Sequence, residues 1–249
     1  MNYREYGSEN KEVIMFLHGG GLSWWNYREE AEMLQDRYRV VIPILDGHSG
    51  SDRHFTSIED NAAEIIAFID EHFGGSVLMI GGLSFGAQIL VEILSERKDI
   101  CRHALVESAM VEPSQFTNSM IKSAFGSSFW LIKQRWFAKL QFKSMHMKPE
   151  LFEDYYRDTC AVEKEDLIAL LQANTAYELK ESFKDSQADV HIYIGQKENK
   201  GIRASALQMQ SVKPGTSLDI LPRLYHGEFS INHADDYVRE VELILNGVK

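Results

Sequence analysis

The segment Gly-Leu-Ser-Phe-Gly at residues 82–86 has the residue types that most directly suggest chemistry. It follows an apolar run at 77–80 and precedes a helical pattern that continues from residue 88. A serine on such a sharp strand-to-helix turn is presented as a nucleophile, and the flanking glycines are needed because a Cβ there would clash. The free N–H groups of the following helix would point at it. We therefore predict that Ser84 is a nucleophile rather than part of a flexible glycine turn.

The segment His-Gly-Gly-Gly at residues 18–21 follows the first long apolar run. Its glycines leave backbone N–H groups free to stabilise an oxyanion without interference from side chains. We expect the amides of Gly20 and Phe85 to form the donor pair, with Gly21 as an alternate. A phosphate-binding loop is disfavoured, because neither Lys-Ser/Thr nor G-x-G-x-x-G spacing is present. His18 itself is expected to be structural.

A serine near its ordinary pKa needs an imidazole base that is oriented by a carboxylate. Among nine histidines, His226 lies in a loop between the last strand pattern and the last helix pattern. His233, at the start of that helix, is its rival. Glu198 follows the penultimate strand pattern and is the expected acid, although a solvated loop charge is another interpretation. Glu107, at the end of an earlier strand pattern, competes for the same role.

Short apolar runs alternate with amphipathic segments in the first half of the chain, which is typical of βαβ units on a parallel sheet. A capping box at 56–59 begins one helix, which the glycine pair 74–75 ends. The last helix is predicted at 234–245. Ligands bind at the carboxyl ends of such strands, where the candidate residues lie. The predicted strands are 13–17, 39–43, 77–80, 104–106, 190–194 and 218–221.

Only helical patterns occur between the fourth and fifth predicted strands. We therefore expect an α/β core at residues 1–112 and 187–249, interrupted by a helical cap at 113–186. This interruption is too long for a plain crossover. Its aromatic-rich run at 129–142 could line an apolar acyl or alcohol pocket, or it could pack the cap onto the core.

Composition excludes several classes of partner. A net charge of -11 and a pI near 5.3 disfavour nucleic acid and anionic lipid, since no basic patch is visible. The apolar stretch 76–94 contains glycines and is interpreted as core, not membrane. Cys101 and Cys160 match no metal-ligand spacing and are expected to be reduced, buried thiols. The N-terminus has no apolar signal region, so a cytoplasmic location is expected.

The motifs HGGG, GLSFG, GQKE and HGE, with the turn DGHSGS at 46–51, together resemble the α/β-hydrolase superfamily over essentially the whole chain. The resemblance implies a mostly parallel, doubly wound sheet with an inserted helical cap. The order Ser84, Glu198, His226 is the order of that superfamily's catalytic triads. Two features depart from its pattern. The acid is Glu where most members have Asp, and the turn differs from P-G-H-G-x-S; His48 within it is expected to be structural.

The resemblance also implies a reaction class. Because the nucleophile is Ser84 rather than Asp, dehalogenase-like and epoxide hydrolase-like chemistry is disfavoured. The expected activity is that of a carboxylesterase acting on a small acyl substrate, with no metal or cofactor. Thioester, lactone or carbon–carbon hydrolysis, a lyase or cofactor-free oxygenation on the same triad, and a weakly catalytic ligand receptor remain alternatives.

Overall fold

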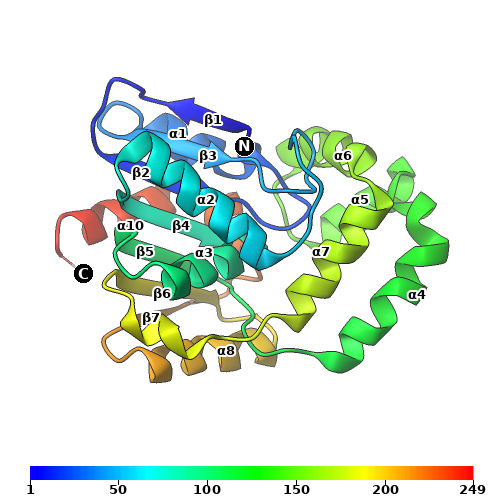
Figure 1. Ribbon diagram of the computed structural model, residues 1–249. Helices are drawn as coiled ribbons and strands as arrows, with labels where there is room; N and C mark the ends of the chain where they lie inside the picture. Colours follow the sequence, from blue (N-terminus) through cyan, green and yellow to red (C-terminus); the bar gives the residue numbers. More distant parts are fainter. Residues whose placement is uncertain (249) are drawn as a thin grey trace.

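A seven-stranded sheet forms the centre of the computed structural model, which describes residues 1–248 (Figure 1). The strand order is β1-β3-β2-β4-β5-β6-β7, and all neighbours are parallel except β1 with β3. The mostly parallel sheet predicted from the sequence is confirmed. The strands are β1 (Tyr3–Tyr6), β2 (Val13–Leu17), β3 (Arg39–Pro43), β4 (Val77–Leu83), β5 (Cys101–Glu107), β6 (Asp189–Gly195) and β7 (Ser217–Leu221).

Helices cover both faces of the sheet, as a doubly wound fold requires (Figure 1). One face packs against α2 (Ile58–Phe73), α3 (Phe85–Glu96) and α8 (Lys200–Val212). The other packs against α1 (Arg28–Leu34) and α10 (Ala234–Leu245), with the short η1 (Trp24–Tyr27) and α9 (Glu228–Asn232) nearby. The central strands are buried on both sides and therefore appear in the sequence as continuous apolar runs.

The ends of α2 confirm their sequence signals. The side chain of Ser57 accepts a hydrogen bond from the Asp60 amide, and Gly74 closes the helix in the left-handed conformation at φ 69°. The edge strand β1 was not predicted, because it is partly exposed and its sequence has no apolar run.

All regular elements between β5 and β6 are helical within the described residues. Figure 1 shows α4 to α7 grouped beyond one end of the sheet. Tyr177 and Phe183, which follow them, are buried in the core with α3. The elements are α4 (Gln115–Ile132), α5 (Arg135–Ser144), η2 (Pro149–Leu151), α6 (Phe152–Ala161), α7 (Lys164–Ala176) and η3 (Glu181–Asp185).

The structure also bears on the apolar stretch and the two cysteines noted in the sequence. No helix among residues 1–248 is both long enough and apolar enough to span a bilayer. Both cysteines are free thiols; Cys101 is buried as expected, whereas Cys160 is only half-buried.

Candidate active site

Ser84 lies between β4 and α3 with a backbone conformation of φ 53° and ψ -109°. Its amide donates to the Glu107 carbonyl at 2.8 Å, which anchors the turn to β5. The flanking glycines are required by close backbone approaches. A Cβ on Gly82 would lie 2.7 Å from the Gly86 carbonyl oxygen, and a Cβ on Gly86 would lie 2.2 Å from that of Leu17. The turn therefore forms only with glycine at both positions, and it presents the serine at the carboxyl end of β4.

Three of the predicted residues meet at this end of the sheet. The Nε2 atom of His226 lies 2.9 Å from Ser84 Oγ, and its Nδ1 atom lies 2.8 Å from Glu198 Oε2. His233, the rival base, lies at the N-terminus of α10, and neither Ser84 nor Glu198 bonds to it. The structure thus brings together Ser84, His226 and Glu198 in one hydrogen-bonded chain.

The loops that carry His226 and Glu198 are held together by their backbones. The Gln196 amide donates to the Leu221 carbonyl at 2.8 Å, and the Lys197 amide donates to the Leu224 carbonyl at 2.9 Å. This approach requires Gly195, since a Cβ there would lie 2.4 Å from the Leu224 oxygen. The backbone after β6 therefore determines where the carboxylate stands relative to the imidazole.

Glu198 has a buried side chain that is 1% exposed, whereas the His226 side chain is 47% exposed and faces a cavity. Burial opposes ionisation of Glu198, but hydrogen bonds from His226 and Ser108 hold the pKa of the carboxyl below its usual value. Burial would likewise lower the pKa of His226, but the hydrogen bond and charge of Glu198 raise it. Sequence reasoning missed Ser108; its only signal is its place directly after the β5 strand.

Glu107, the competing acid, has a different environment. Its Oε1 atom accepts a hydrogen bond from the Ser230 amide at 3.3 Å, and its Oε2 atom has no hydrogen-bond partner within residues 1–248. Burial raises the pKa of this carboxyl to about 7. Since neither oxygen bonds to His226, the geometry favours Glu198 over Glu107 as the group that orients the imidazole.

Two backbone amides next to Ser84 are free to bind an oxyanion. Phe85 is the first residue of α3, so its N–H has no partner within the helix. Gly20 lies next to Phe85: a Cβ built on Gly20 would be 3.2 Å from the Phe85 Cβ. Neither amide donates to an acceptor in the described part of the chain. The Gly21 amide, the predicted alternate, already donates to His48 Nε2 at 3.1 Å and is therefore unavailable.

His18 and His48 form hydrogen bonds with backbone groups of the surrounding loops. This is the structural role that was expected for both residues. His18 Nε2 accepts from the Leu45 amide at 3.2 Å, and His48 Nδ1 donates to the Asp46 carbonyl at 3.0 Å. Burial lowers the pKa of His48 to about 4 and that of His18 well below its usual value. Both rings are thus neutral near pH 7, which lets His48 accept the Gly21 hydrogen bond and fix the glycine loop.

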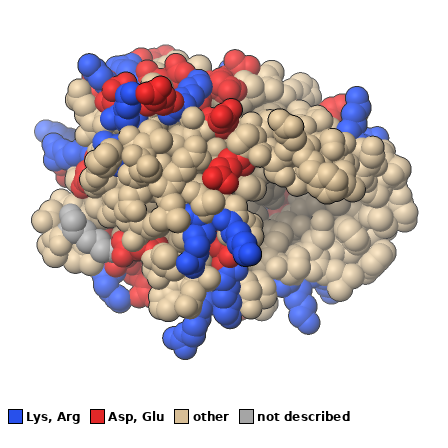
Figure 2. Space-filling view, turned by 90° about the horizontal axis from the view of Figure 1, so that it is seen from below, with Lys and Arg blue, Asp and Glu red and all other residues tan. Residues whose placement is uncertain are grey.

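Two cavities adjoin the candidate catalytic residues. One of about 290 Å³ is lined by Ser84, Glu198 and His226, and a second of about 250 Å³ lies beside it. The cavities share Gly20, Leu22 and Met145. Figure 2 shows a hollow in the molecular surface between the part that contains the sheet and the part formed by α4 to α7. The walls of this hollow are mostly uncharged.

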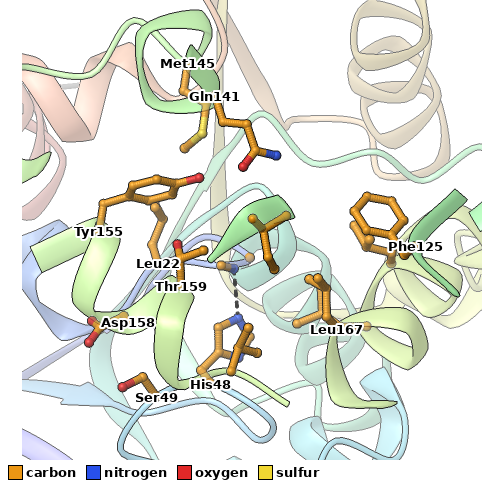
Figure 3. Close-up of a pocket in the computed structure, with 16 residues that line it drawn as sticks. Leu22, His48, Ser49, Phe125, Gln141, Met145, Tyr155, Asp158, Thr159 and Leu167 are labelled. Atoms are coloured by element: carbon orange, nitrogen blue, oxygen red, sulfur yellow. Dashed lines mark hydrogen bonds between the residues drawn. The ribbon is translucent and has the colours of Figure 1, made fainter. Parts of the chain in front are cut away.

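The second cavity is mainly apolar, and most of its wall comes from α4 to α7. Figure 3 shows Phe125 and Leu167 on one side of it and Tyr155 on the other. The remaining wall consists of Gly20, Gly21, Leu22, His48, Ser49, Ile132, Gln141, Met145, Asp158, Thr159, Val162, Leu170 and Leu171.

The aromatic residues of 129–142 do not line either cavity, so of the two interpretations of this run, the one in which it forms the pocket wall is wrong. Trp130 and Trp136 are 60% and 59% exposed, because their side chains point away from the cavities and the core. Phe142 is buried, with its ring centroid 5.4 Å from that of Tyr155. Only Ile132 and Gln141 of this run contribute to the apolar wall within the described residues.

Comparisons with known proteins identify the family and the fold. The profile of the alpha/beta hydrolase family matches residues 14–241. No curated protein sequence is significantly similar to the chain.

Solved structures share the fold at low identity. A thermophilic esterase from Thermogutta terrifontis is 14% identical, with a TM-score of 0.82 over 99% of this chain and 93% of that one. The enol-lactonase from Burkholderia xenovorans is 14% identical, with a TM-score of 0.82 over 98% and 96%. A meta-cleavage product hydrolase from Pseudomonas fluorescens is 16% identical, with a TM-score of 0.77 over 100% and 94%.

Proposed function

The chain belongs to the alpha/beta hydrolase family, and on that premise we propose that it is a serine hydrolase that cleaves carboxylic esters or related acyl substrates. The observation that carries the proposal is the hydrogen-bonded chain from Ser84 through His226 to the buried Glu198. Its serine and imidazole face a cavity that can hold a small substrate. In such a chain the imidazole acts as the base that activates the serine, and the buried carboxylate orients the imidazole and stabilises its protonated form.

In the proposed reaction, Ser84 Oγ attacks the acyl carbon while its proton passes to His226 Nε2. Glu198 holds the imidazole in the required tautomer and stabilises its protonated form. The Gly20 and Phe85 amides donate to the developing oxyanion. His226 then protonates the leaving alcohol, and it next removes a proton from the water that hydrolyses the acyl-enzyme.

The test combines a fluorophosphonate label with turnover of p-nitrophenyl esters. We expect the wild-type chain to be labelled at Ser84 and to hydrolyse a short ester, and Ser84→Ala to do neither. Labelling without ester turnover would favour carbon–carbon cleavage, a lyase or a ligand receptor on the same residues. Absence of labelling at Ser84 would contradict the whole proposal.

The apolar cavity predicts where substrate selectivity is determined. Leu167→Trp places a larger side chain in the cavity beside Phe125. It should lower kcat/KM for a long acyl ester relative to a short one by at least about 10-fold, because one methylene in an apolar pocket contributes about 1–3 kcal/mol of discrimination. Trp136→Leu is the matched control, because Trp136 is exposed. The measurement is kcat/KM over an acyl-length series. A control variant that changed the ratio as much as Leu167→Trp would refute this assignment of the wall.

The pH dependence follows from the hydrogen bond between His226 and Glu198. His226 must be neutral to accept the Ser84 proton, so kcat/KM should fall as pH drops through the pKa of His226. Burial lowers that pKa and Glu198 raises it, with a net increase above the usual 6.5. The midpoint of the acid limb is therefore expected above 6.5, and it should move to lower pH in Glu198→Gln. An unchanged midpoint in that variant would contradict the role of Glu198.

A further inference from the structure

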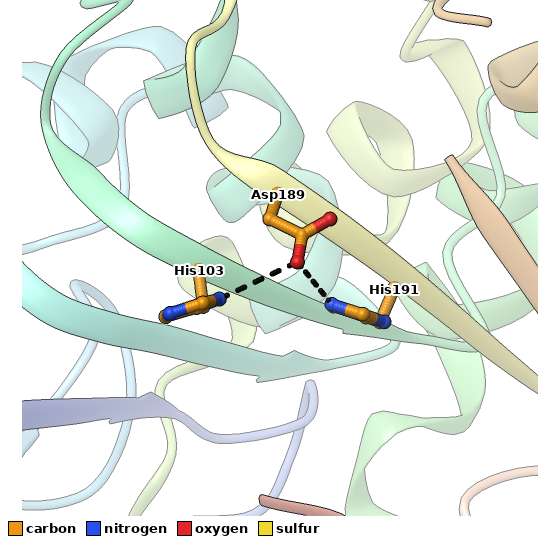
Figure 4. Close-up of side chains that lie close together, drawn as sticks. All are labelled: His103, Asp189 and His191. Atoms are coloured by element: carbon orange, nitrogen blue, oxygen red, sulfur yellow. Dashed lines mark hydrogen bonds and ion pairs between the residues drawn. The ribbon is translucent and has the colours of Figure 1, made fainter. Parts of the chain in front are cut away.

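A second cluster of ionisable side chains lies at the opposite end of the sheet from Ser84. His103 is near the start of β5, and Asp189 and His191 are at the start of β6. Glu107, whose carbonyl accepts a hydrogen bond from the Ser84 amide, lies at the other end of the same β5 strand. Figure 4 shows the two imidazole rings approaching one carboxylate oxygen of Asp189 from opposite sides.

Strand geometry explains this arrangement. His103 and Asp189 are paired across the parallel β5 and β6 strands. His191 is two residues beyond Asp189, and residues two apart on a strand point to the same face. All three side chains therefore project from one face of the sheet. Their ligand atoms, the two imidazole nitrogens and a carboxylate oxygen, lie within 4.8 Å of one another.

Two imidazole nitrogens face one carboxylate oxygen of Asp189. His191 Nε2 lies 2.9 Å and His103 Nδ1 lies 3.5 Å from Asp189 Oδ2. His103 Nδ1 is buried and makes no hydrogen bond in the described part of the chain. His103 therefore has a buried ring nitrogen that faces Asp189 without a hydrogen-bond partner in this part of the chain.

We propose that His103, Asp189 and His191 bind a divalent transition-metal ion of the Zn²⁺ class. Imidazole and carboxylate are ligands that Zn²⁺ prefers, whereas Mg²⁺ and Ca²⁺ take oxygen ligands. Tetrahedral bonds to Zn²⁺ hold ligand atoms about 3.3 Å apart, close to the 2.9 Å and 3.5 Å observed. The Asp189 side chain is 48% exposed, so water can complete the coordination.

Ser217 orients one of these ligands. Its Oγ atom lies 2.9 Å from His191 Nδ1. When a metal binds Nε2, the neutral imidazole carries its proton on Nδ1. The Ser217 hydroxyl can then accept a hydrogen bond from Nδ1–H, because a hydroxyl is both donor and acceptor. A hydrogen bond to the second ring nitrogen is the usual support of a metal-bound histidine. The ion would join β5 to β6 away from the reacting groups, so it is expected to stabilise the fold and leave ester hydrolysis unchanged.

The experiment measures Zn²⁺ binding to the full chain by calorimetry and thermal unfolding, after chelation and removal of any affinity tag. At about 100 times the dissociation constant, Zn²⁺ should raise Tm by roughly 5–10 °C. Ser217→Ala should weaken binding about 10- to 100-fold, and His103→Ala should weaken it further. The matched control is His54→Ala, because His54 is an exposed histidine beside Asp166 in a separate cluster.

Asp189→Asn provides a second ligand variant at an exposed position, should His103→Ala fail to fold. Loss of the Zn²⁺-dependent Tm shift in the ligand variants but not in His54→Ala supports the site. Zn²⁺ binding that is absent up to millimolar concentration, or equally strong in wild type and Asp189→Asn, would overturn it. Because the ion is remote from Ser84, fluorophosphonate labelling is expected to be the same with and without Zn²⁺, and it tests the proposed hydrolase function separately.

Discussion

Replacing Ser84 by alanine is expected to lower kcat for ester hydrolysis on the order of 10⁶-fold, the loss that follows removal of the nucleophile in serine hydrolases. The reason is that His226 Nε2 and the two free amides are arranged around Ser84 Oγ, and no other hydroxyl bonds to that nitrogen in residues 1–248. Turnover of a p-nitrophenyl ester, measured with enough protein to detect the residual rate, gives the value.

Two further variants separate lost chemistry from lost structure. Ser84 has a φ of 53°, a conformation that costs a non-glycine residue about 1–3 kcal/mol and that glycine adopts freely. Ser84→Gly should therefore be as inactive as the alanine variant while unfolding at a temperature no lower than wild type. Ser144→Ala changes another serine that lines the same cavity, and it should retain activity. Comparable losses in Ser84→Ala and Ser144→Ala would contradict the assignment.

Glu198→Gln is expected to lower kcat about 10⁴-fold, since an amide favours the wrong imidazole tautomer and cannot stabilise the protonated ring. The carboxylate of Glu198 is buried and accepts hydrogen bonds from His226 and Ser108, so both of its oxygens are already committed to the ionised form. The measurement is kcat in the pH range where wild-type activity is constant, so that the displaced acid limb does not affect the comparison.

Glu107→Gln is the matched control, because it makes the same change at the competing carboxyl. We expect its kcat to stay near wild type. Burial raises the pKa of Glu107 from 4.5 to about 7, so the wild-type fold loses stability from this group as pH rises between those values. Gln cannot ionise, and Tm of the variant should fall less between mildly acidic and mildly basic pH. A folded but inactive Glu107→Gln beside an active Glu198→Gln would reverse the assignment of the acid.

Much of the fold and part of the site follow from local sequence. The central strands are predicted because both faces of the sheet are covered, which makes each strand a short apolar run. Ser57 and Gly74 mark the ends of α2 because they satisfy its terminal backbone groups. The turn around Ser84 is equally local, since its glycines are required by the backbone they adjoin. Ser84, His226 and Glu198 could thus be nominated by their positions after strands.

Contacts between segments far apart in the chain could be decided only by the tertiary structure. The choice of Glu198 over Glu107 depends on the backbone bonds that join the loops after β6 and β7. The unavailability of the Gly21 amide depends on His48, which folds back from a different turn.

The wall of the apolar cavity and the cluster of His103, Asp189 and His191 also depend on contacts that the local sequence does not reveal. The aromatic run at 129–142 is apolar in sequence, but the orientation of α4 and α5 leaves Trp130 and Trp136 in solvent. His103 stands far from Asp189 in the chain, and only the register of β5 on β6 places the two together. Residue type and spacing determined which groups could react and which strands would carry them. Strand register and helix orientation, which arise from packing over the whole chain, decided which of those groups meet.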